Sequence, residues 1–246
     1  DDARRFSGLN VSTQVPSDWF GGSKLYLDPF VWRFRQDARR WGAETAREER
    51  TYVGARLWGA AGPAQLDWTL ARQTGRFGDR DIEALQVFTT QSMRAGEGAG
   101  ASRISLRVDY GSGGGAYDGG VIRNALTPQG VPIFYSYQNV FNPVMIAVAP
   151  GVTVRQGKTS VTGEVQFTWR ASERDAVYRA TDLPYAGTEV VEGRHVGEVW
   201  KLQLAHTISP RTSLIARYEH LAAGSVLKDA GYESSDYLTA WVNFRF

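Results

Sequence analysis

The chain is built largely of segments in which apolar and polar residues alternate. In Leu238–Phe246 every second residue is apolar, and the residues between them are mostly polar. Segment 160–171 alternates as cleanly, with valine, phenylalanine and tryptophan opposite threonine, glutamate, glutamine and arginine. Because successive side chains of a strand point to opposite faces, this pattern predicts strands with one apolar and one polar face.

The same pattern recurs along the whole sequence. Segment 82–92 fits least well, because both of its parities carry apolar residues. Most segments have about 10–12 residues, a length that suits a tilted membrane crossing and exceeds the roughly 5–6 residues of strands in soluble proteins. We predict eleven strands, at 4–15, 24–36, 50–59, 64–75, 82–92, 102–110, 140–156, 160–171, 196–208, 212–221 and 238–246.

The connections between these segments alternate in length. Short turns rich in glycine and proline lie near 60–63, 157–159 and 209–211, and longer polar loops lie near 37–49, 111–139, 172–194 and 222–235. Short periplasmic turns and long outer loops are typical of bacterial outer-membrane proteins. The predicted fold is therefore all-β: one antiparallel transmembrane β-barrel over residues 1–246. A soluble β-sandwich or solenoid is the alternative, which the strand lengths disfavour.

Composition narrows the class further. The mean hydropathy is −0.34, and no window approaches the 18 or so apolar residues of a spanning helix, which excludes a helical membrane protein. Eight Trp and eleven Tyr suit the aromatic girdles of a barrel. The absence of cysteine excludes disulfides, thiolate metal sites and cysteine nucleophiles. A net charge of +2 is too balanced to indicate nucleic acid, and we expect no cofactor.

The strand count is odd, and this has a consequence for the barrel. With the C-terminus on the periplasmic side, eleven strands place Asp1 on the outside, whereas bacterial single-chain barrels normally have an even number. A twelfth strand at Ile133–Tyr137 is one interpretation. The other, which fits the order of short turns and long loops better, is that the chain is the later part of a larger barrel.

Several motifs follow one another in a distinctive order. They are Trp32-Arg33-Phe34-Arg35-Gln36-Asp37, Tyr52–Arg56, Thr168-Trp169-Arg170 with Asp175–Tyr178, Val196-Gly197, Tyr218-Glu219-His220-Leu221 with Gly224, and Ser235–Phe246. In these motifs the chain resembles the later portion of the alginate-export family of outer-membrane porins. The resemblance implies a monomeric barrel of eighteen strands in the bacterial outer membrane. It also implies passage of anionic polysaccharide or, in relatives, other small solutes.

Basic residues on the polar parity form the candidate site. A lumen lined by guanidinium groups favours anions, and arginine binds carboxylates bidentately. Alternatively, the same groups pair with acids such as Asp67, Asp109, Glu164 and Glu219 and tie the wall together, and both roles are compatible. The predicted pore-lining residues are Arg33, Arg35, Arg56, Arg103, Arg107, Arg170, Arg217, Arg245 and Lys201.

Two loop features are open to more than one interpretation. The glycine-rich segment 111–120 either folds inward as a constriction or caps the pore, or it forms a mobile surface loop. The acidic pair Glu48-Glu49 lies between Arg47 and Arg50 and is most simply a solvated charge cluster in a loop, with divalent ions or lipopolysaccharide as weaker alternatives.

We therefore predict a passive pore rather than an enzyme. Expected partners are anionic polysaccharide or small anionic solutes, outer-membrane lipid and lipopolysaccharide, and an additional chain or segment that completes the barrel. The alternatives are a general porin for small anions or organic acids, an outer-membrane barrel hydrolase and a barrel that serves mainly as an assembly or adhesion scaffold. A hydrolase would have only His195, His206 and His220 as histidine bases, and no His-x-x-x-His metal spacing occurs.

Overall fold

The protein forms one continuous antiparallel sheet of twelve strands, which confirms the predicted all-β fold. The computed structural model describes residues 4–20, 24–96, 98, 101–126, 145–180 and 183–245. The candidate strand Ile133–Tyr137 and the terminal residues Asp1 and Phe246 lie outside the described residues. In spatial order the strands are β1 (Arg4–Asn10), β3 (Lys24–Trp41), β4 (Glu44–Ala61), β5 (Ala64–Phe77), β6 (Arg80–Ala95), β7 (Ser102–Gly111), β8 (Met145–Gln156), β9 (Thr159–Arg170), β12 (His195–Ser209), β13 (Thr212–Ala223) and β14 (Ser235–Phe244), with β2 (Thr13–Gln14) also paired to β3.

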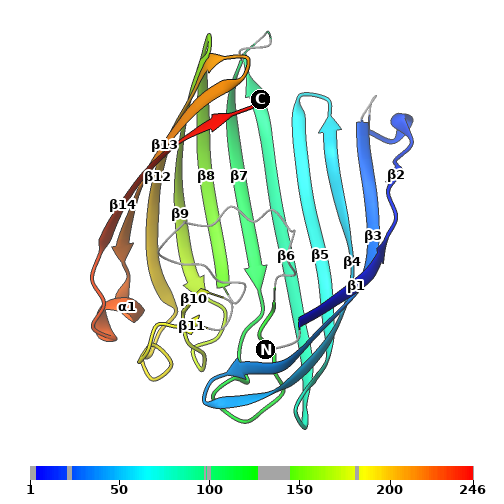
Figure 1. The fold of residues 1–246 in the computed structure, drawn as a ribbon, viewed down its shortest axis with the longest axis vertical. Coiled ribbons are helices and arrows are strands. Elements are labelled where there is room, and N and C mark those ends of the chain that lie inside the picture. Colours follow the sequence, from blue (N-terminus) through cyan, green and yellow to red (C-terminus); the bar gives the residue numbers. More distant parts are fainter. Residues whose placement is uncertain are drawn as a thin grey trace.

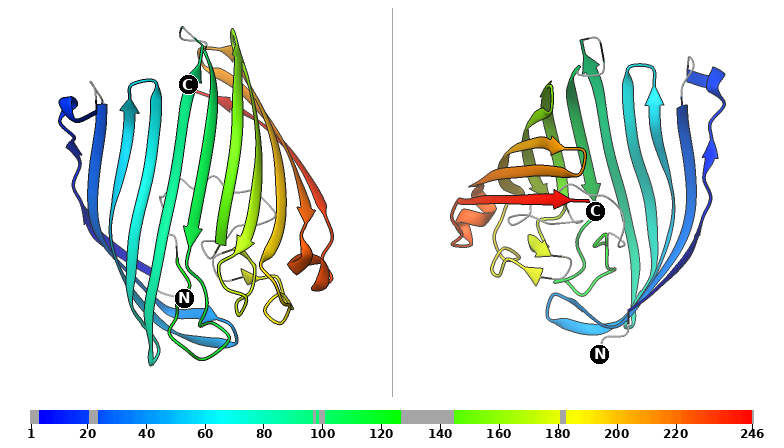
Figure 2. Two further views of the ribbon diagram at one scale, coloured as in Figure 1. Left: turned by 180° about the vertical axis from the view of Figure 1, so that it is seen from behind. Right: turned by 45° about the horizontal axis from the view of Figure 1, so that its top comes forward.

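The sheet curves strongly around an inner face (Figure 1). Short turns join strands at one end, at the top of Figure 1. The long connections after β7, β9 and β13 lie at the other end, together with the tight turns of the hairpins β3–β4 and β5–β6. We call these the short-turn end and the long-connection end. Within the described residues β1 and β14 do not pair with each other, so the sheet is an open, partial barrel (Figure 2).

Each of the eleven predicted segments corresponds to a strand on this path, although the first is interrupted. β1 and β2 both bond to β3 in the same register, and the interruption between them lies at Ser12, whose hydroxyl donates to the carboxylate of Asp28 at 2.6 Å. A short 3-10 helix, η1 (Ser17–Phe20), precedes β3.

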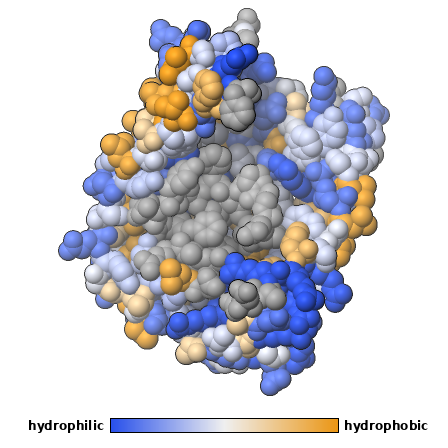
Figure 3. All heavy atoms as spheres, in the orientation of Figure 1, coloured by the Kyte–Doolittle hydropathy of each residue, from blue (hydrophilic) through white to orange (hydrophobic). Residues whose placement is uncertain are grey.

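The outer face is apolar and the inner face is polar, the reverse of a soluble protein. Figure 3 shows apolar residues along the flanks of the sheet and hydrophilic residues gathered at its lower end. Exposed outer side chains include Val53, Leu70, Ile104, Trp200, Leu202, Leu238 and Val242. Buried inner side chains include Arg50, Gln73, Arg107, Gln166 and Glu219. Apolar surface on this scale, alternating with a polar lining, is the pattern of a wall between lipid and water.

The predicted polar loop at 37–49 is wrong, because β3 and β4 continue through it as a hairpin. Its turn is at Gly42, whose φ of +59° favours glycine. The charges that suggested a loop alternate between the two faces of this hairpin. Glu48 lies inside, fully buried, and accepts a 2.7 Å bond from the Trp41 indole. Glu49 is exposed on the other face, so the two glutamates do not form one solvated cluster.

The inner face of β6 carries apolar residues where other segments cover it. Ile82 lies beneath residues 112–126, which we call the inward segment, and Phe88 packs in a second core with Val177. Ile122 bridges Ile82 in parallel, and both are buried in a core that also contains Trp41, Phe77 and Tyr178. This explains why both parities of 82–92 carry apolar residues. Of the two interpretations of the glycine-rich loop, its described part therefore supports inward folding.

The remaining connections also pack at the long-connection end. β10 (Tyr178–Ala180) pairs with β11 (Leu183–Pro184), and α1 (Ser225–Asp229) buries Val226 and Leu227. No helix among the described residues has the length and apolar character needed to span a membrane.

Candidate pore lining on the inner face

A network of buried polar side chains joins β4, β5 and β6 near the long-connection end. Arg50 is fully buried and lies 2.9 Å from the carboxylate of Glu48. It also donates to the side-chain oxygen of Gln73 and, at 2.7 Å, to the backbone oxygen of Asn124 in the inward segment. Gln73 continues the network by donating to Gln86 at 3.0 Å. This part of the inner face therefore holds the inward segment by direct hydrogen bonds.

A second network spans β7, β8, β9 and β12. Arg107 reaches over β8 to Glu164 at 2.9 Å and Gln166 at 2.8 Å on β9, and Lys201 of β12 lies 3.0 Å from the same Glu164. Ala149 pairs with Arg107 in the strand register, and its methyl group leaves room for the guanidinium to cross. Arg107 also pairs with Asp109 on its own strand.

Two further predicted arginines are paired on the inner face. Arg56 binds Asp67 bidentately, with N–O distances of 2.7 and 2.6 Å. Arg217 donates to Gln203 at 3.1 Å and lies 3.8 Å from Glu219. In the middle of the wall, cations are thus largely balanced by acids, as predicted by the interpretation in which ion pairs link the strands of the wall.

Arg170 has a different role from the other predicted arginines. Its guanidinium is buried and, among the described residues, donates to backbone oxygens, including those of Gly193 at 2.6 Å and Asp175 at 2.9 Å. Those oxygens belong to the connection between β9 and β12. Arg170 therefore anchors that connection and is shielded from the lumen.

Arg33 and Arg35 lie on the outer face, so their placement in the lumen has to be corrected. In β3 the inner positions are occupied by aromatic residues, and Phe30 and Trp32 stack with ring centroids 3.8 Å apart beside buried Tyr52. The inner face of this strand is therefore aromatic and its arginines face outward, the opposite of the predicted arrangement. Arg245 follows β14 at the short-turn end, where its side chain is exposed and its backbone N–H donates to the Arg211 oxygen.

Basic residues gather at the short-turn end of the inner face. Arg94 and Arg103 are directly opposite each other across β6 and β7, and Arg155 ends the inner side of β8. Lys158 follows in the next turn. In the described part of the chain no carboxylate lies within ion-pair distance of these residues, although Arg103 donates to Ser92 at 3.3 Å. We call Arg94, Arg103, Arg155 and Lys158 the cationic mouth.

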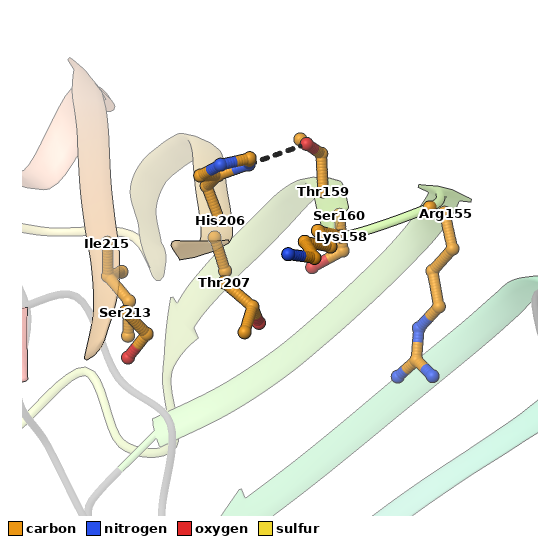
Figure 4. Close-up of a pocket in the computed structure, with 10 residues that line it drawn as sticks. Arg155, Lys158, Thr159, Ser160, His206, Thr207, Ser213 and Ile215 are labelled. Atoms are coloured by element: carbon orange, nitrogen blue, oxygen red, sulfur yellow. Dashed lines mark hydrogen bonds between the residues drawn. The ribbon is translucent and has the colours of Figure 1, made fainter. Parts of the chain in front are cut away.

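A cavity of about 360 Å³ lies beside the cationic mouth. Figure 4 shows Arg155, Thr207 and Ser213 projecting to one side of the strands, and His206 and Thr159 to the other. Its polar lining residues carry hydroxyl, imidazole, ammonium and guanidinium groups, and none of the described lining residues is acidic. Among the residues of the cationic mouth, the sequence analysis predicted only Arg103 to line the pore. The shared parity of Arg94 and Arg155 was visible, but their proximity depends on strand register.

Asp175 ties the inward segment to the β9–β12 connection. Its carboxylate accepts bonds from the Tyr178 hydroxyl at 2.8 Å and the Gly114 backbone N–H at 2.9 Å. Asn124 donates to the same tyrosine oxygen at 3.1 Å. Burial raises the pKa of Asp175 to about 6, against the opposing effect of these hydrogen bonds.

A comparison with known families decides the class of this protein. A family model described as alginate export matches residues 1–241. The chain belongs to the alginate export family. The motif resemblance is thereby confirmed, and membership of this family of transport porins supports an outer-membrane polysaccharide export pore as the general role. The chain matches none of the curated proteins.

In this alginate export protein the three histidines lie apart from one another. His195 bonds Glu198 at 2.9 Å, His206 bonds Thr159 at 2.9 Å, and His220 bonds Asp236 at 2.9 Å. His206 lies on the outer parity of a strand end, as predicted. Among the described residues no group of three or more acids and histidines is placed to hold a metal.

Proposed function

We propose that this alginate export protein forms the wall of a passive pore that admits alginate, or a related anionic polysaccharide, at its cationic mouth. The observation that carries the proposal is the contrast between two regions of the inner face. In the middle of the wall Arg56, Arg107 and Arg217 are balanced by acids. At the short-turn end four basic residues have no acidic partner in the described structure.

This contrast has a direct electrostatic meaning. A paired arginine shapes the local field but leaves little net charge, whereas unpaired cations beside a low-dielectric wall attract anions from solution. Arginine offers bidentate bonds to the carboxylate of each uronate. The hydroxyls of Thr207 and Ser213 beside the mouth can bond the hydroxyls of a sugar ring. The mouth thus suits a polymer that is both anionic and rich in hydroxyl groups.

At the opposite end the inward segment forms the natural constriction of this pore. Arg50, Asp175 and Ile82 hold it against the inner face of the wall. A solute that leaves at the long-connection end then passes a constriction whose width is fixed by a packed segment rather than by a free loop. In this arrangement polysaccharide enters from the periplasm and leaves at the cell surface.

The surroundings of the pore are part of the same proposal. The apolar outer face contacts outer-membrane lipid, and further strands bond to the free edges of β1 and β14 and complete the barrel. Unpaired backbone groups along a sheet edge are costly in lipid, which is the reason to expect such strands. They belong either to this polypeptide or to an additional chain.

Channel recordings with alginate oligomers test this function. We expect single channels in planar bilayers to be blocked by the oligomers. The triple variant Arg94→Glu/Arg103→Glu/Arg155→Glu should weaken the block at least about tenfold, because each reversal replaces an attraction by a repulsion. Arg174→Glu/Lys228→Glu, which changes exposed residues in two other connections outside the inward segment, is the control.

Two results would count against the proposal. Unchanged block in the triple variant would show that the cationic mouth does not bind the polymer. An anion-selective current that oligomers do not block would identify a general porin for small anions instead.

A further inference from the structure

The outer face carries a sharp boundary between apolar and basic residues at the long-connection end. Strand register aligns Leu9, Val31 and Val53 in one row across β1, β3 and β4, and they are 68%, 47% and 56% exposed. Two residues further along each strand, a distance of about 7 Å, the row is Ser7, Arg33 and Thr51. The next row contains Arg5, Arg35 and Glu49, followed on β5 by Arg76.

These arginines are only partly neutralised. Arg35 lies 3.0 Å from Asp37, and Arg76 lies 3.4 Å from Asp81. Neither Arg5 nor Arg33 has an acidic partner within ion-pair distance in the part of the chain that the structure describes. Both side chains are exposed. The row of basic residues therefore keeps an excess of positive charge that faces away from the lumen.

The same residues line a cavity of about 350 Å³. Arg5, Ser7, Arg33, Arg35 and Arg76 contribute basic or hydroxyl groups to it, and Glu49 is its acidic member on this face. Arginine binds phosphate bidentately, and a serine hydroxyl can donate to a further phosphate oxygen. A cavity of this size accommodates one phosphorylated sugar headgroup.

We infer that this cavity binds a phosphate of lipopolysaccharide in the outer leaflet. The inference rests on the proposed placement of the outer face in lipid. The apolar row beneath the arginines would contact acyl chains, and the arginines would then lie at the level of the headgroups. The polysaccharide in the lumen cannot be the ligand, because alternation puts these side chains on the opposite side of the wall. We call Arg5, Ser7, Arg33, Arg35 and Arg76 the headgroup site.

Binding of lipopolysaccharide to the purified full chain in detergent tests this site. The ligands are intact lipopolysaccharide, the same preparation after enzymatic removal of its lipid phosphates, and inorganic phosphate. Arg5→Gln/Arg33→Gln should bind intact lipopolysaccharide roughly 30-fold more weakly, since each basic residue near an anionic lipid surface contributes about a factor of five. The matched control is Arg4→Gln/Arg174→Gln, in which Arg4 neighbours Arg5 on the opposite face of β1.

Each outcome decides the inference. Weaker binding by the headgroup-site variant and by the dephosphorylated ligand, with normal binding by the control, supports it. Equal affinity of the two double variants, or of the two lipid preparations, overturns it. Tight binding of inorganic phosphate alone would also overturn it, because the cavity would then be a site for small anions rather than for a lipid headgroup. Single-channel conductance is recorded in parallel. If a variant loses lipid binding but conducts normally, the headgroup site is separate from the pore. If the protein binds lipid but forms no channels, only the proposed function is overturned.

Discussion

Removal of the Arg50 charge should destabilise the wall and release the inward segment. Arg50 and Glu48 are both fully buried, 2.9 Å apart, and Arg50 also bonds Gln73 and the Asn124 backbone. In Arg50→Met the side chain keeps much of its volume but loses its charge and all three bonds. Among the described residues, Glu48 then keeps only the 2.7 Å bond from the Trp41 indole.

The magnitude follows from the group that is left behind. Breaking a buried pair by removing one partner costs about 3–5 kcal/mol, because the remaining charge is uncompensated. The orphaned Asn124 oxygen adds about 1 kcal/mol. Glu48→Gln/Arg50→Met should recover most of the first contribution, because an amide carries no charge and can still accept the indole N–H. We expect the double variant to lose only about 1–3 kcal/mol.

Urea unfolding from lipid vesicles, followed by tryptophan fluorescence, measures these differences. Hydrogen exchange of residues 112–126 is the second readout, and it should accelerate in Arg50→Met. Arg72→Met, an exposed outer residue, is the control for loss of an arginine. If the double variant is as unstable as the sum of the two single variants, the argument from an uncompensated buried charge is refuted.

Two further predictions concern contacts of the inner face. Because folding raises the pKa of Asp175 from an ordinary 3.8 to about 6, the protonated form is favoured in the fold. Docking of the inward segment is then strongest below about pH 4 and weakens by up to about 3 kcal/mol as pH rises to 6. Hydrogen exchange corrected for intrinsic rates should show this pH dependence, and Asp175→Asn should abolish it; a dependence that persists in Asp175→Asn contradicts the assignment. Ala149→Leu should block the crossing of Arg107 over β8 and lower the free energy of unfolding by about 2–4 kcal/mol, whereas Ala216→Leu on the outer face should have little effect, and equal effects would show that the crossing is not the cause.

The alternation of residues was sufficient to predict the strands and most of their faces. In a strand with lipid on one side and water on the other, apolar and polar residues must alternate. Segments such as 160–171 show this alternation without interruption. The pattern failed where another segment of the chain packs on the inner face of the sheet. Ile82 is an apolar residue on the inner face of β6 because the inward segment packs on it, and the charges at 37–49 lie on a continuing hairpin.

The candidate site was predicted less completely than the fold. Parity placed Arg107 and Lys201 on the inner face, but it could not show that they share Glu164, since that contact depends on the small residues of β8. The stacked aromatic residues inside β3 reversed the expected faces of Arg33 and Arg35. The cationic mouth was missed because its members come from three strands and a turn.

The zero-current potential of single channels in a salt gradient tests the central claim most directly. If the cationic mouth governs entry, the protein with its natural sequence is anion-selective. In Arg94→Glu/Arg103→Glu/Arg155→Glu the potential then falls toward zero or changes sign. A channel that is cation-selective, or whose potential is the same in the triple variant, would contradict the account of this pore.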